Sequence, residues 1–396
     1  MARSGIRVIP RILVSLLGAA VLCMSGADMA AADPPGSSIR AREWWLASMH
    51  APDTIWPVST GVGITVAVID SGVEASHPDL AGQVLQGQNF SGLSGGASAD
   101  TDGHGTAMAS LIAGTGKGWQ GNGMYGLAPG VKILPLRVVA LGGNAAASAV
   151  SFNRQLSLAI RSAANSTAMI ISISMSQAEG GSNMQDAVNY ALSKGKLIVA
   201  SVGNSGKMGN PVLYPAAFPG VVGVGETDES GNVATESEHG AQVVLTAPGS
   251  GVYEACVGPS GYCSGHGTSD SAALVSASAA LLWAVHPSWT ADQIIRVLIN
   301  TANSGGKPGV QNPYYGYGLV RPRLALTEPG DPGPADVNPL LPASASTGVS
   351  AAARASVSAG QKSSGSSMVW IVGGVAVLVL GAAAAGLLLA RRRARG

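Results

Sequence analysis

The chain has 396 residues, more than one hydrophobic core usually organises, so we expect appendages or a second domain beside a globular part. Hydrophobic types make up 46% of the residues and charged types 11%, which excludes a wholly disordered chain. The formal net charge of +1 excludes the strong basic excess of a nucleic-acid-binding protein, so no nucleic acid is expected as a partner. Arginines are concentrated at both ends around a mildly acidic middle, which is typical of a chain that meets a membrane twice.

The N-terminus has the features of a secretory signal peptide. An apolar run at 12–22 follows three arginines, and the small residues Ala30-Ala31-Ala32 come after it. A basic start, a short apolar segment and an A-x-A site predict a signal peptide over residues 1–32. The alternative, a buried helix of a soluble fold, is disfavoured by the position at the extreme terminus. Residues 33–60 then form an N-terminal extension.

From Ile64 to Leu326, short apolar runs alternate with amphipathic stretches. Runs rich in β-branched residues and bounded by Gly, Asn, Asp or Pro predict strands at 64–69, 132–139, 168–173, 196–202, 220–225 and 242–248. Helices are predicted at 151–164, 184–193, 271–284 and 290–300. This alternation predicts an α/β, three-layer fold in which helices cover both faces of a mostly parallel sheet. In such sheets, functional groups gather at the carboxyl ends of the strands.

A linker and a membrane span are predicted after the globular part. Residues 327–368 are rich in Pro, Ala and Ser and lack apolar periodicity, which predicts a disordered linker. Residues 369–390 carry no charge and would reach about 33 Å as a helix, enough to cross a bilayer as one transmembrane helix. The basic tail at 391–396 is then cytoplasmic, and it disfavours the alternative of a GPI-type signal. We therefore expect a single-pass protein of the cell membrane whose globular domain lies outside the cytoplasm.

The three cysteines predict one disulfide. Cys23 lies in the predicted signal peptide, which leaves Cys256 and Cys263. In an exported chain we expect these two to close a small loop, and the alternative is two free thiols. Their spacing builds no metal site.

Three polar residues stand at the ends or starts of predicted elements. Asp70 follows the first predicted strand, His104 lies between two glycines before a small apolar segment, and Ser269 precedes a predicted helix. A carboxylate can orient an imidazole, an imidazole can act as a base, and a serine at a helix N-terminus meets N–H groups that stabilise an oxyanion. Each alone has a simpler explanation, a turn or cap for Asp70 and a helix N-cap for Ser269. Four other histidines compete for the role of base: His77, His239, His266 and His286.

A fourth candidate, Asn204, follows the strand predicted at 196–202. Its amide could donate a second hydrogen bond to an oxyanion, and the alternative is a turn asparagine beside glycine. The order Asp, His, Asn, Ser, with each residue at a strand end or helix start, fits one arrangement of serine hydrolases.

Four local sequences resemble the motifs of subtilisin-like serine proteases, namely VAVIDSGV (66–73), DGHGTAMAS (102–110), SVGNSG (201–206) and GTSDSA (267–272). Supporting matches are SHPDLAG (76–82), GLAPGVKILPLRV (126–138) and APG (247–249). The resemblance implies a subtilisin-like peptidase domain at 61–326 that hydrolyses peptide bonds through an acyl-enzyme. It gives Asp70 the role of orienter, His104 that of base and Ser269 that of nucleophile. Asn204 becomes the oxyanion donor.

The sequence departs from the family pattern in two places. Asp270-Ser271-Ala272-Ala273 stands where the family commonly has Met-Ala-x-Pro after its serine. The Asp270 carboxylate favours the helix dipole but opposes a developing oxyanion. The usual Asn-Met-Ser-Leu-Gly segment is replaced by 172–176, SISMS, whose backbone at Ser172, Ser174 and Ser176 is expected to bind an extended peptide as an added strand.

The order of signal peptide, peptidase domain, linker, span and basic tail resembles that of mycosins, membrane-anchored subtilisin-like proteases associated with type VII secretion in actinobacteria. The extension at 33–60 is too short for an independent inhibitory domain, and its tryptophans and Glu43 are expected to tie it to the catalytic domain. The resemblance implies a serine endopeptidase that processes substrates of a type VII secretion system or supports its membrane components. The alternatives are a structural component that stabilises the secretion complex without catalysis and a protease for general turnover at the cell surface.

No cofactor is expected to be required. Many members of the family bind calcium, but no contiguous acidic loop in this sequence specifies a calcium site, so no metal ligand is assigned. The clusters Asp228-Glu229 and Glu236–Glu238 are more simply solvated surface.

Overall fold

The computed structural model of the chain describes residues 39–139, 145–305 and 309–342. The predicted signal peptide, membrane span and basic tail lie outside the described residues.

The centre of the domain is a seven-stranded, all-parallel sheet in the order β2-β3-β1-β4-β5-β6-β7. The strands are β1 (Thr65–Asp70), β2 (Gln88–Asn89), β3 (Lys132–Arg137), β4 (Ile170–Ile173), β5 (Leu197–Ser201), β6 (Val222–Thr227) and β7 (Leu245–Pro248). All six predicted strands are present, because a buried parallel strand is apolar on both faces and stands out as a continuous apolar run. The two-residue strand β2 is too short to produce such a pattern.

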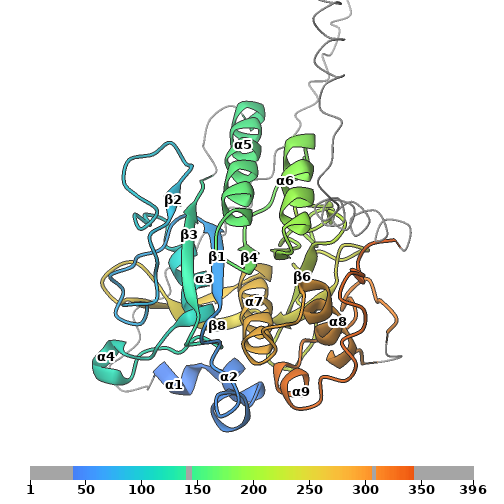
Figure 1. Ribbon diagram of the computed structural model, residues 1–396. Coiled ribbons are helices and arrows are strands. Elements are labelled where there is room, and N and C mark those ends of the chain that lie inside the picture. Colours follow the sequence, from blue (N-terminus) through green and yellow to red (C-terminus); the bar gives the residue numbers. More distant parts are fainter. Residues whose placement is uncertain (1–38, 140–144, 306–308, 343–396) are drawn as a thin grey trace, which may run out of the picture. The chain divides into compact units, whose positions relative to one another are not determined.

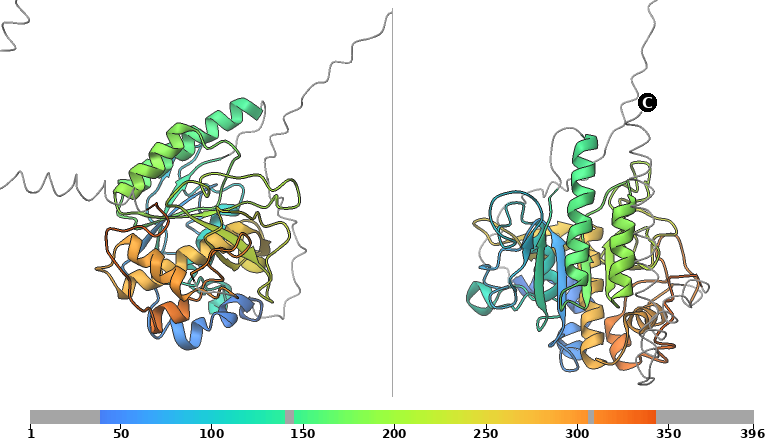
Figure 2. Two further views of the ribbon diagram at one scale, coloured as in Figure 1. Left: turned by 90° about the vertical axis from the view of Figure 1, so that its right-hand side faces the viewer. Right: turned by 45° about the horizontal axis from the view of Figure 1, so that its top comes forward.

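Helices cover both faces of the sheet, which confirms the predicted three-layer α/β fold (Figures 1 and 2). On one face, α5 (Ala145–Ala164) and α6 (Ser182–Ser193) pack over Ala67 and Ile69 of β1. On the other face, α3 (His104–Ala113) and α7 (Thr268–Val285) pack over Val66 and Val68. Alternate side chains of one strand thus enter two separate cores, as the pleat requires.

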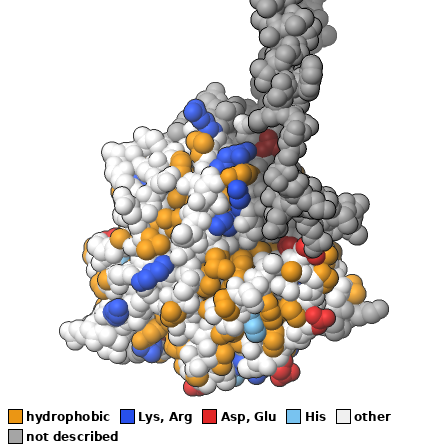
Figure 3. All heavy atoms as spheres, viewed as in Figure 1, with side chains coloured by type: hydrophobic (Ala, Val, Ile, Leu, Met, Phe, Trp, Pro, Cys, Tyr) orange, Lys and Arg blue, Asp and Glu red, His pale blue; other side chains and the backbone are white. Residues whose placement is uncertain are grey.

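The outer surface of the α5–α6 layer is basic on the face shown in Figure 3, where Lys and Arg side chains gather over these two helices. Arg161 of α5 and Lys194 at the end of α6 each lie 5.3 Å from the ring centre of Tyr190. The contact of Arg161 with Tyr190 adds to the packing of α5 on α6, whereas the contact of Lys194 lies within the end of α6.

Helix α7 runs through the middle of the domain and contacts β1 and every strand from β4 to β7. Its side chains are mostly Ala and Ser, which let the sheet approach closely. Among the described residues it is the one helix long and apolar enough to cross a membrane, but 89% of it is buried inside the protein. It is therefore a core helix. Helix α8 (Ala291–Thr301) follows it and begins with a capping box between Thr290 and Gln293.

Two strands that the sequence analysis did not predict, β8 (Ser250–Ala255) and β9 (Tyr262–His266), form an antiparallel hairpin that leads into α7. Cys256 and Cys263 form a disulfide across this hairpin. Glycine and polar residues interrupt the apolar pattern in both strands, so neither produces a clear strand signal.

The N-terminal extension folds onto the domain as α1 (Ile39–Arg42), α2 (Trp44–Ser48) and the π-helical turn η1 (Ala51–Ile55). Its predicted attachment is confirmed by hydrogen bonds from Trp44 Nε1 to Gly251 O and from Trp56 Nε1 to Leu127 O. Trp45 is fully buried in the core, so the extension is part of the folded domain. The remaining two helices of the described residues are short, α4 (Gly118–Gly121) and α9 (Pro322–Thr327).

The first part of the predicted linker, residues 327–342, packs onto α8, so the predicted boundary of the linker is wrong. Thr290 Oγ1, Gln293 Nε2 and Arg296 Nη2 donate hydrogen bonds to the carbonyl oxygens of Ala335, Gly333 and Val337, respectively. The segment lacks apolar periodicity, and it is held in place instead by side chains of α8 and its N-cap that bond to its backbone. Residues 343–368 of the predicted linker lie outside the described residues.

Candidate active site

The four candidate residues lie at one edge of the sheet. Asp70 is the last residue of β1, and Asn204 follows the end of β5. His104 begins α3 and Ser269 is the second residue of α7. Carboxyl ends of parallel strands and N-termini of the following helices meet at this edge, so the fold brings together residues that are 199 positions apart in the chain.

Asp70 and His104 are in direct contact. His104 Nδ1 lies 2.8 Å from Asp70 Oδ1, which also accepts a hydrogen bond from the backbone N–H of Ser71. Asp70 is buried, and the His104 side chain is 26% exposed. Gly105 makes the approach possible, because a Cβ atom there would collide with the carbonyl oxygen of Gly72. The carboxylate therefore fixes the ring through Nδ1 and leaves Nε2 for the other side.

Charge around His104 favours its protonated form. Burial by itself lowers the pKa of the imidazole, but the negative charge of Asp70 and its hydrogen bond oppose this effect. The charges of Asp270 and Asp102 add to that of Asp70, and together they raise the pKa of His104 to about 9.

The Ser269 hydroxyl forms its hydrogen bond with Ser174 and not with His104. Ser269 Oγ donates a hydrogen bond to Ser174 O at 3.3 Å, and Ser174 Oγ donates to Ser269 O at the same distance. Both His104 and Ser269 are among the described residues, and no hydrogen bond joins them there. The fold thus brings Asp70 and His104 together, while the contact between His104 and Ser269 is not made in this conformation.

Asn204 is held by Thr268, the residue before Ser269. Asn204 Oδ1 accepts hydrogen bonds from the backbone N–H and the hydroxyl of Thr268. Its Nδ2 lies toward Gly267, where a Cβ atom would come within 3.0 Å of it. No role was predicted for Thr268 from the sequence. The Gly-Thr-Ser motif contained this residue, but its contact with Asn204 depends on the tertiary fold.

The three serines proposed to bind substrate differ in their positions. Ser172 lies inside β4, and its backbone pairs with β1 on one side and β5 on the other. It cannot pair with an added strand, so its assignment is wrong. Its hydroxyl accepts a hydrogen bond from Ser276 of α7 in the core. Ser174 and Ser176 follow the end of β4, outside the paired strand, where Ser174 is already next to Ser269.

Three of the four competing histidines make contacts that are typical of residues with a structural role, and none of the four contacts Asp70 among the described residues. The His77 ring lies 2.9 Å from Gly261 O, His239 stacks on Tyr314, and His286 stacks on Trp289. His266 is exposed at the end of β9. Of the five candidates for a base, His104 is the one in contact with Asp70.

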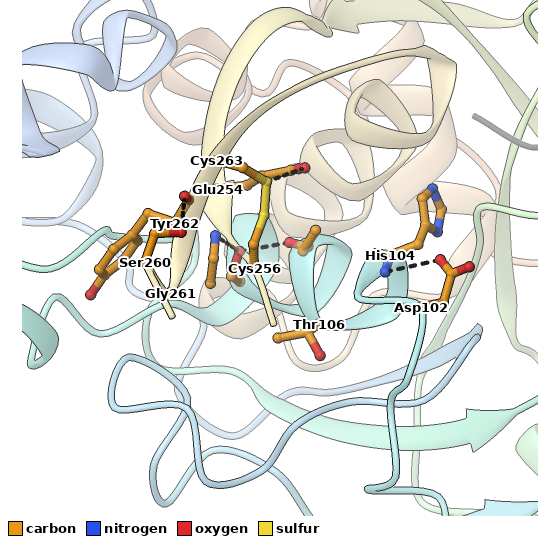
Figure 4. Close-up of a disulfide and its surroundings, with 12 residues drawn as sticks. Asp102, His104, Thr106, Glu254, Cys256, Ser260, Gly261, Tyr262 and Cys263 are labelled. Atoms are coloured by element: carbon orange, nitrogen blue, oxygen red, sulfur yellow. Dashed lines mark hydrogen bonds between the residues drawn. A yellow bond between two sulfur atoms is a disulfide. The ribbon is translucent and has the colours of Figure 1, made fainter. Parts of the chain in front are cut away.

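The disulfide hairpin stands beside this site (Figure 4). In the described part of the chain, the one group of side chains with metal-ligand spacing is Glu254, Cys256 and Cys263. Its two sulfurs are joined in the disulfide and offer no thiolate, so these residues do not fit a metal ion.

The comparison with known proteins identifies relatives. The model of the subtilase family matches residues 61–318. Subtilisin BL from Lederbergia lenta is 34% identical over 283 residues, which are 71% of this chain and 97% of that protein. MycP1 from the ESX-1 type VII secretion system has a similar structure, with a TM-score of 0.67 and 28% identity over 78% of this chain and 91% of that one. The periplasmic assembly from the ESX-5 inner membrane complex contains a chain with a TM-score of 0.65 and 28% identity over 78% and 90% of the two chains.

Proposed function

Because the chain belongs to the subtilase family and is a serine-type endopeptidase, we propose that it cleaves polypeptides with Ser269 as nucleophile, His104 as general base and Asp70 as the group that orients His104. The observation that carries this proposal is the 2.8 Å contact between His104 Nδ1 and Asp70 Oδ1 at the end of β1. It leaves Nε2 of the ring as the nitrogen that can accept the proton of Ser269.

The first step needs a change of partner for the Ser269 hydroxyl. Rotation of its side chain away from Ser174 O brings Oγ toward His104, which must be neutral to accept the proton. Oγ then forms a bond to the carbonyl carbon of the substrate while its proton passes to His104. His104 next donates this proton to the leaving amine, which leaves an acyl-enzyme, and water activated by His104 hydrolyses the acyl-enzyme.

The tetrahedral intermediate carries its negative charge on the former carbonyl oxygen. We assign its stabilisation to Nδ2 of Asn204 and to the backbone N–H of Ser269 at the start of α7. The support for Asn204 is that its Oδ1 is occupied by Thr268, so the Nδ2 group is available as a donor. The helix N-terminus adds a favourable dipole.

The substrate is proposed to bind as an extended chain along the segment after β4. Ser174 and Ser176 lie there with backbone that is outside the sheet, and Ser174 touches the nucleophile. A peptide added along this segment would place its carbonyl next to Ser269.

The proposed setting is the outer side of the cell membrane. A signal peptide at 1–32, an uncharged run at 369–390 and an arginine-rich tail support export with one C-terminal anchor. Likeness to MycP1 of the ESX-1 type VII secretion system and to a chain of the ESX-5 assembly supports a role in processing the substrates of a type VII system or in supporting its membrane complex.

The test is covalent labelling with a fluorophosphonate, which reacts with an activated serine. Full-length protein in detergent is expected to be labelled at Ser269, and labelling is expected to disappear in Ser269→Ala and in His104→Ala. Ser193→Ala, at the exposed end of α6, is the matched control and should label like the wild type. Labelling that persists in Ser269→Ala would refute the assignment.

A structural role without catalysis is the second candidate, and the likeness to a chain of the ESX-5 periplasmic assembly favours it. In cells that lack the wild-type gene, Ser269→Ala separates the two roles. Restored secretion with unprocessed substrates supports the structural role, and lost secretion supports a requirement for cleavage. General surface turnover instead predicts broad cleavage of unfolded proteins such as casein.

A further inference from the structure

Behind the loop that carries Asn204 lies a buried carboxyl group that the mechanism above does not use. Glu238, in the segment between β6 and β7, is 0% exposed. The sequence analysis interpreted the cluster Glu236–Glu238 as solvated surface, and for Glu238 this interpretation is wrong. Complete withdrawal of a carboxyl group from water costs free energy, so its position in the fold needs a physical reason.

The side chain of Glu238 packs directly against the backbone of Gly203, the residue before Asn204. A Cβ atom at Gly203 would lie 2.7 Å from Glu238 Cδ and 2.8 Å from its Oε1. The carboxyl group therefore occupies the space where any other residue at this position would have its side chain. Leu213 closes the same space, because its Cδ1 atom would lie 2.5 Å from that Cβ atom.

The backbone of the Glu238 segment holds the same loop on both sides of Asn204. Glu238 N–H donates a 3.0 Å hydrogen bond to Gly203 O. Beyond Asn204, Gly206 N–H donates a 2.8 Å hydrogen bond to Glu236 O. Asn204 thus stands between two residues that are anchored to one segment.

The conformation of this loop depends on its neighbours, because glycine by itself fixes little. Gly203 has a φ of +112°, and glycine populates positive and negative φ about equally. Its N–H is bonded to Thr268 Oγ1 and its carbonyl oxygen to Glu238 N–H. Its Cα faces the Glu238 carboxyl group. The peptide that leads into Asn204 is therefore held by contacts on three sides, two of which come from Glu238.

The carboxyl group of Glu238 is mostly protonated at neutral pH. Burial raises its pKa to about 8, although the backbone N–H of Ser205 lies close enough to lower it. Neither carboxyl oxygen has a hydrogen bond of normal geometry in the described structure. A neutral group is the form that such surroundings tolerate, so Glu238 supports the loop by packing rather than by charge.

We propose that Glu238 is a positioning residue for the oxyanion donor: its buried carboxyl group, packed against Cα of Gly203, fixes the loop so that Nδ2 of Asn204 stays where the oxyanion forms. This inference rests on the role proposed above for Asn204. A donor stabilises an oxyanion at about 2.7–3.1 Å, and a misplacement of about 1 Å can slow catalysis about 10²-fold. Glu238 thereby acts on the rate through Asn204.

The test compares the steady-state cleavage of fluorogenic casein by full-length variants in detergent. Glu238→Ala removes the packing, and we expect kcat to fall about tenfold or more while KM changes less than about twofold, because the donor acts mainly in the transition state. Glu238→Gln keeps the shape of the neutral carboxyl group and should retain the wild-type kcat. An unchanged kcat in Glu238→Ala overturns the proposal, as does an equal fall of kcat in Glu238→Gln.

Val188→Ala is the matched control for the loss of buried volume. Val188 is 0% exposed in α6, so this variant should lower the Tm, as Glu238→Ala does, without changing kcat. Glu238→Asp withdraws the carboxyl group by one methylene and serves where Glu238→Ala does not fold. A several-fold lower kcat is expected in Glu238→Asp, and a wild-type kcat overturns the proposal.

A double-mutant cycle measures whether Glu238 acts through Asn204. In an Asn204→Ala background, Glu238→Ala should lower kcat little further, because the donor that it positions is already gone. If the two losses multiply in the double variant, Glu238 acts on another part of the site, and the proposal is overturned.

Hydrogen–deuterium exchange gives a readout that needs no activity. Peptides covering residues 202–206 should exchange faster in Glu238→Ala than in the wild type, and at the wild-type rate in Glu238→Gln. Equal exchange in Glu238→Ala and the wild type overturns the proposal. If the wild type neither cleaves casein nor reacts with fluorophosphonate, the proposed function fails, and exchange alone decides whether Glu238 positions the loop. If the wild type cleaves through Ser269 but Glu238→Ala keeps its kcat, this inference alone fails.

Discussion

Thr268 holds Asn204 by two hydrogen bonds, because its backbone N–H and its hydroxyl donate to Asn204 Oδ1 at 3.0 and 2.9 Å. The same hydroxyl accepts a hydrogen bond from the backbone N–H of Gly203 at 3.1 Å. One side chain thus joins the end of β5 to the start of α7. It also decides which end of the Asn204 amide remains free, and the free end is the donor that an oxyanion needs.

Removing this donor should slow catalysis. Asn204→Ala is expected to lower kcat about 10²- to 10³-fold with little change in KM, because the donor acts mainly in the transition state. Thr268→Val keeps the shape but loses the hydroxyl, so a smaller fall is expected, and Thr268→Ser should restore the rate. Steady-state cleavage of a fluorogenic casein measures these effects. An unchanged kcat in Asn204→Ala would contradict the assignment.

The buried Glu43 should make the stability depend on pH. Burial raises the pKa of Glu43 to about 7 from 4.5, against the hydrogen bond that its carboxylate accepts from Tyr125 N. The folded protein therefore binds this proton more tightly than the unfolded chain. The stabilisation is fully present below about pH 4.5 and is lost as the pH rises to about 7, by at most about 3 kcal/mol.

Glu43→Gln cannot ionise and should remove this loss. We expect a higher Tm than the wild type at pH 8 and a similar Tm at pH 4.5. Glu179→Gln, an exposed surface substitution, is the control and should leave both values unchanged. A Tm at pH 8 that is no higher in Glu43→Gln than in the wild type would contradict the prediction.

Tyr262 ties the hairpin to the segment between β1 and β2 that contains Asp79. Its hydroxyl donates a 2.6 Å hydrogen bond to Asp79 Oδ2, and Asp79 also accepts hydrogen bonds from the backbone N–H groups of Gly118 and Met124. Tyr262→Phe removes one donor from a fully buried carboxylate, so we expect a loss of about 2 kcal/mol in urea unfolding. Tyr253→Phe, on the neighbouring strand, is the comparison and should cost less. Equal effects of the two substitutions would argue against a special role of the contact with Asp79.

The disulfide should stabilise the hairpin that carries Glu254. Cys256 and Cys263 close a loop with a sequence separation of 7. Loop-closure entropy predicts that Cys256→Ser/Cys263→Ser lowers the free energy of unfolding by about 2 kcal/mol. The same loss is expected when the wild type is treated with a reductant, and the double variant should not respond to reductant. A reductant effect that persists in the double variant would point to another target.

The sequence alone determined the parts of the fold and site that local patterns encode. Buried parallel strands are apolar on both faces, so the runs that became β1 and β5 were visible without the structure. The short motifs around Asp70, His104, Asn204 and Ser269 were visible for a similar reason, because each combines a functional group with the glycines and small residues that a close approach of backbone requires.

The tertiary structure decided what depends on the path of the chain between these segments. Ser172 looked equivalent to Ser174, but only the pairing of β4 on both sides shows that its backbone is occupied. The contact of the Ser269 hydroxyl with Ser174 joins residues 95 positions apart. No periodicity records such contacts, because the energy of a buried hydroxyl or carboxyl group depends on the neighbours that folding brings to it.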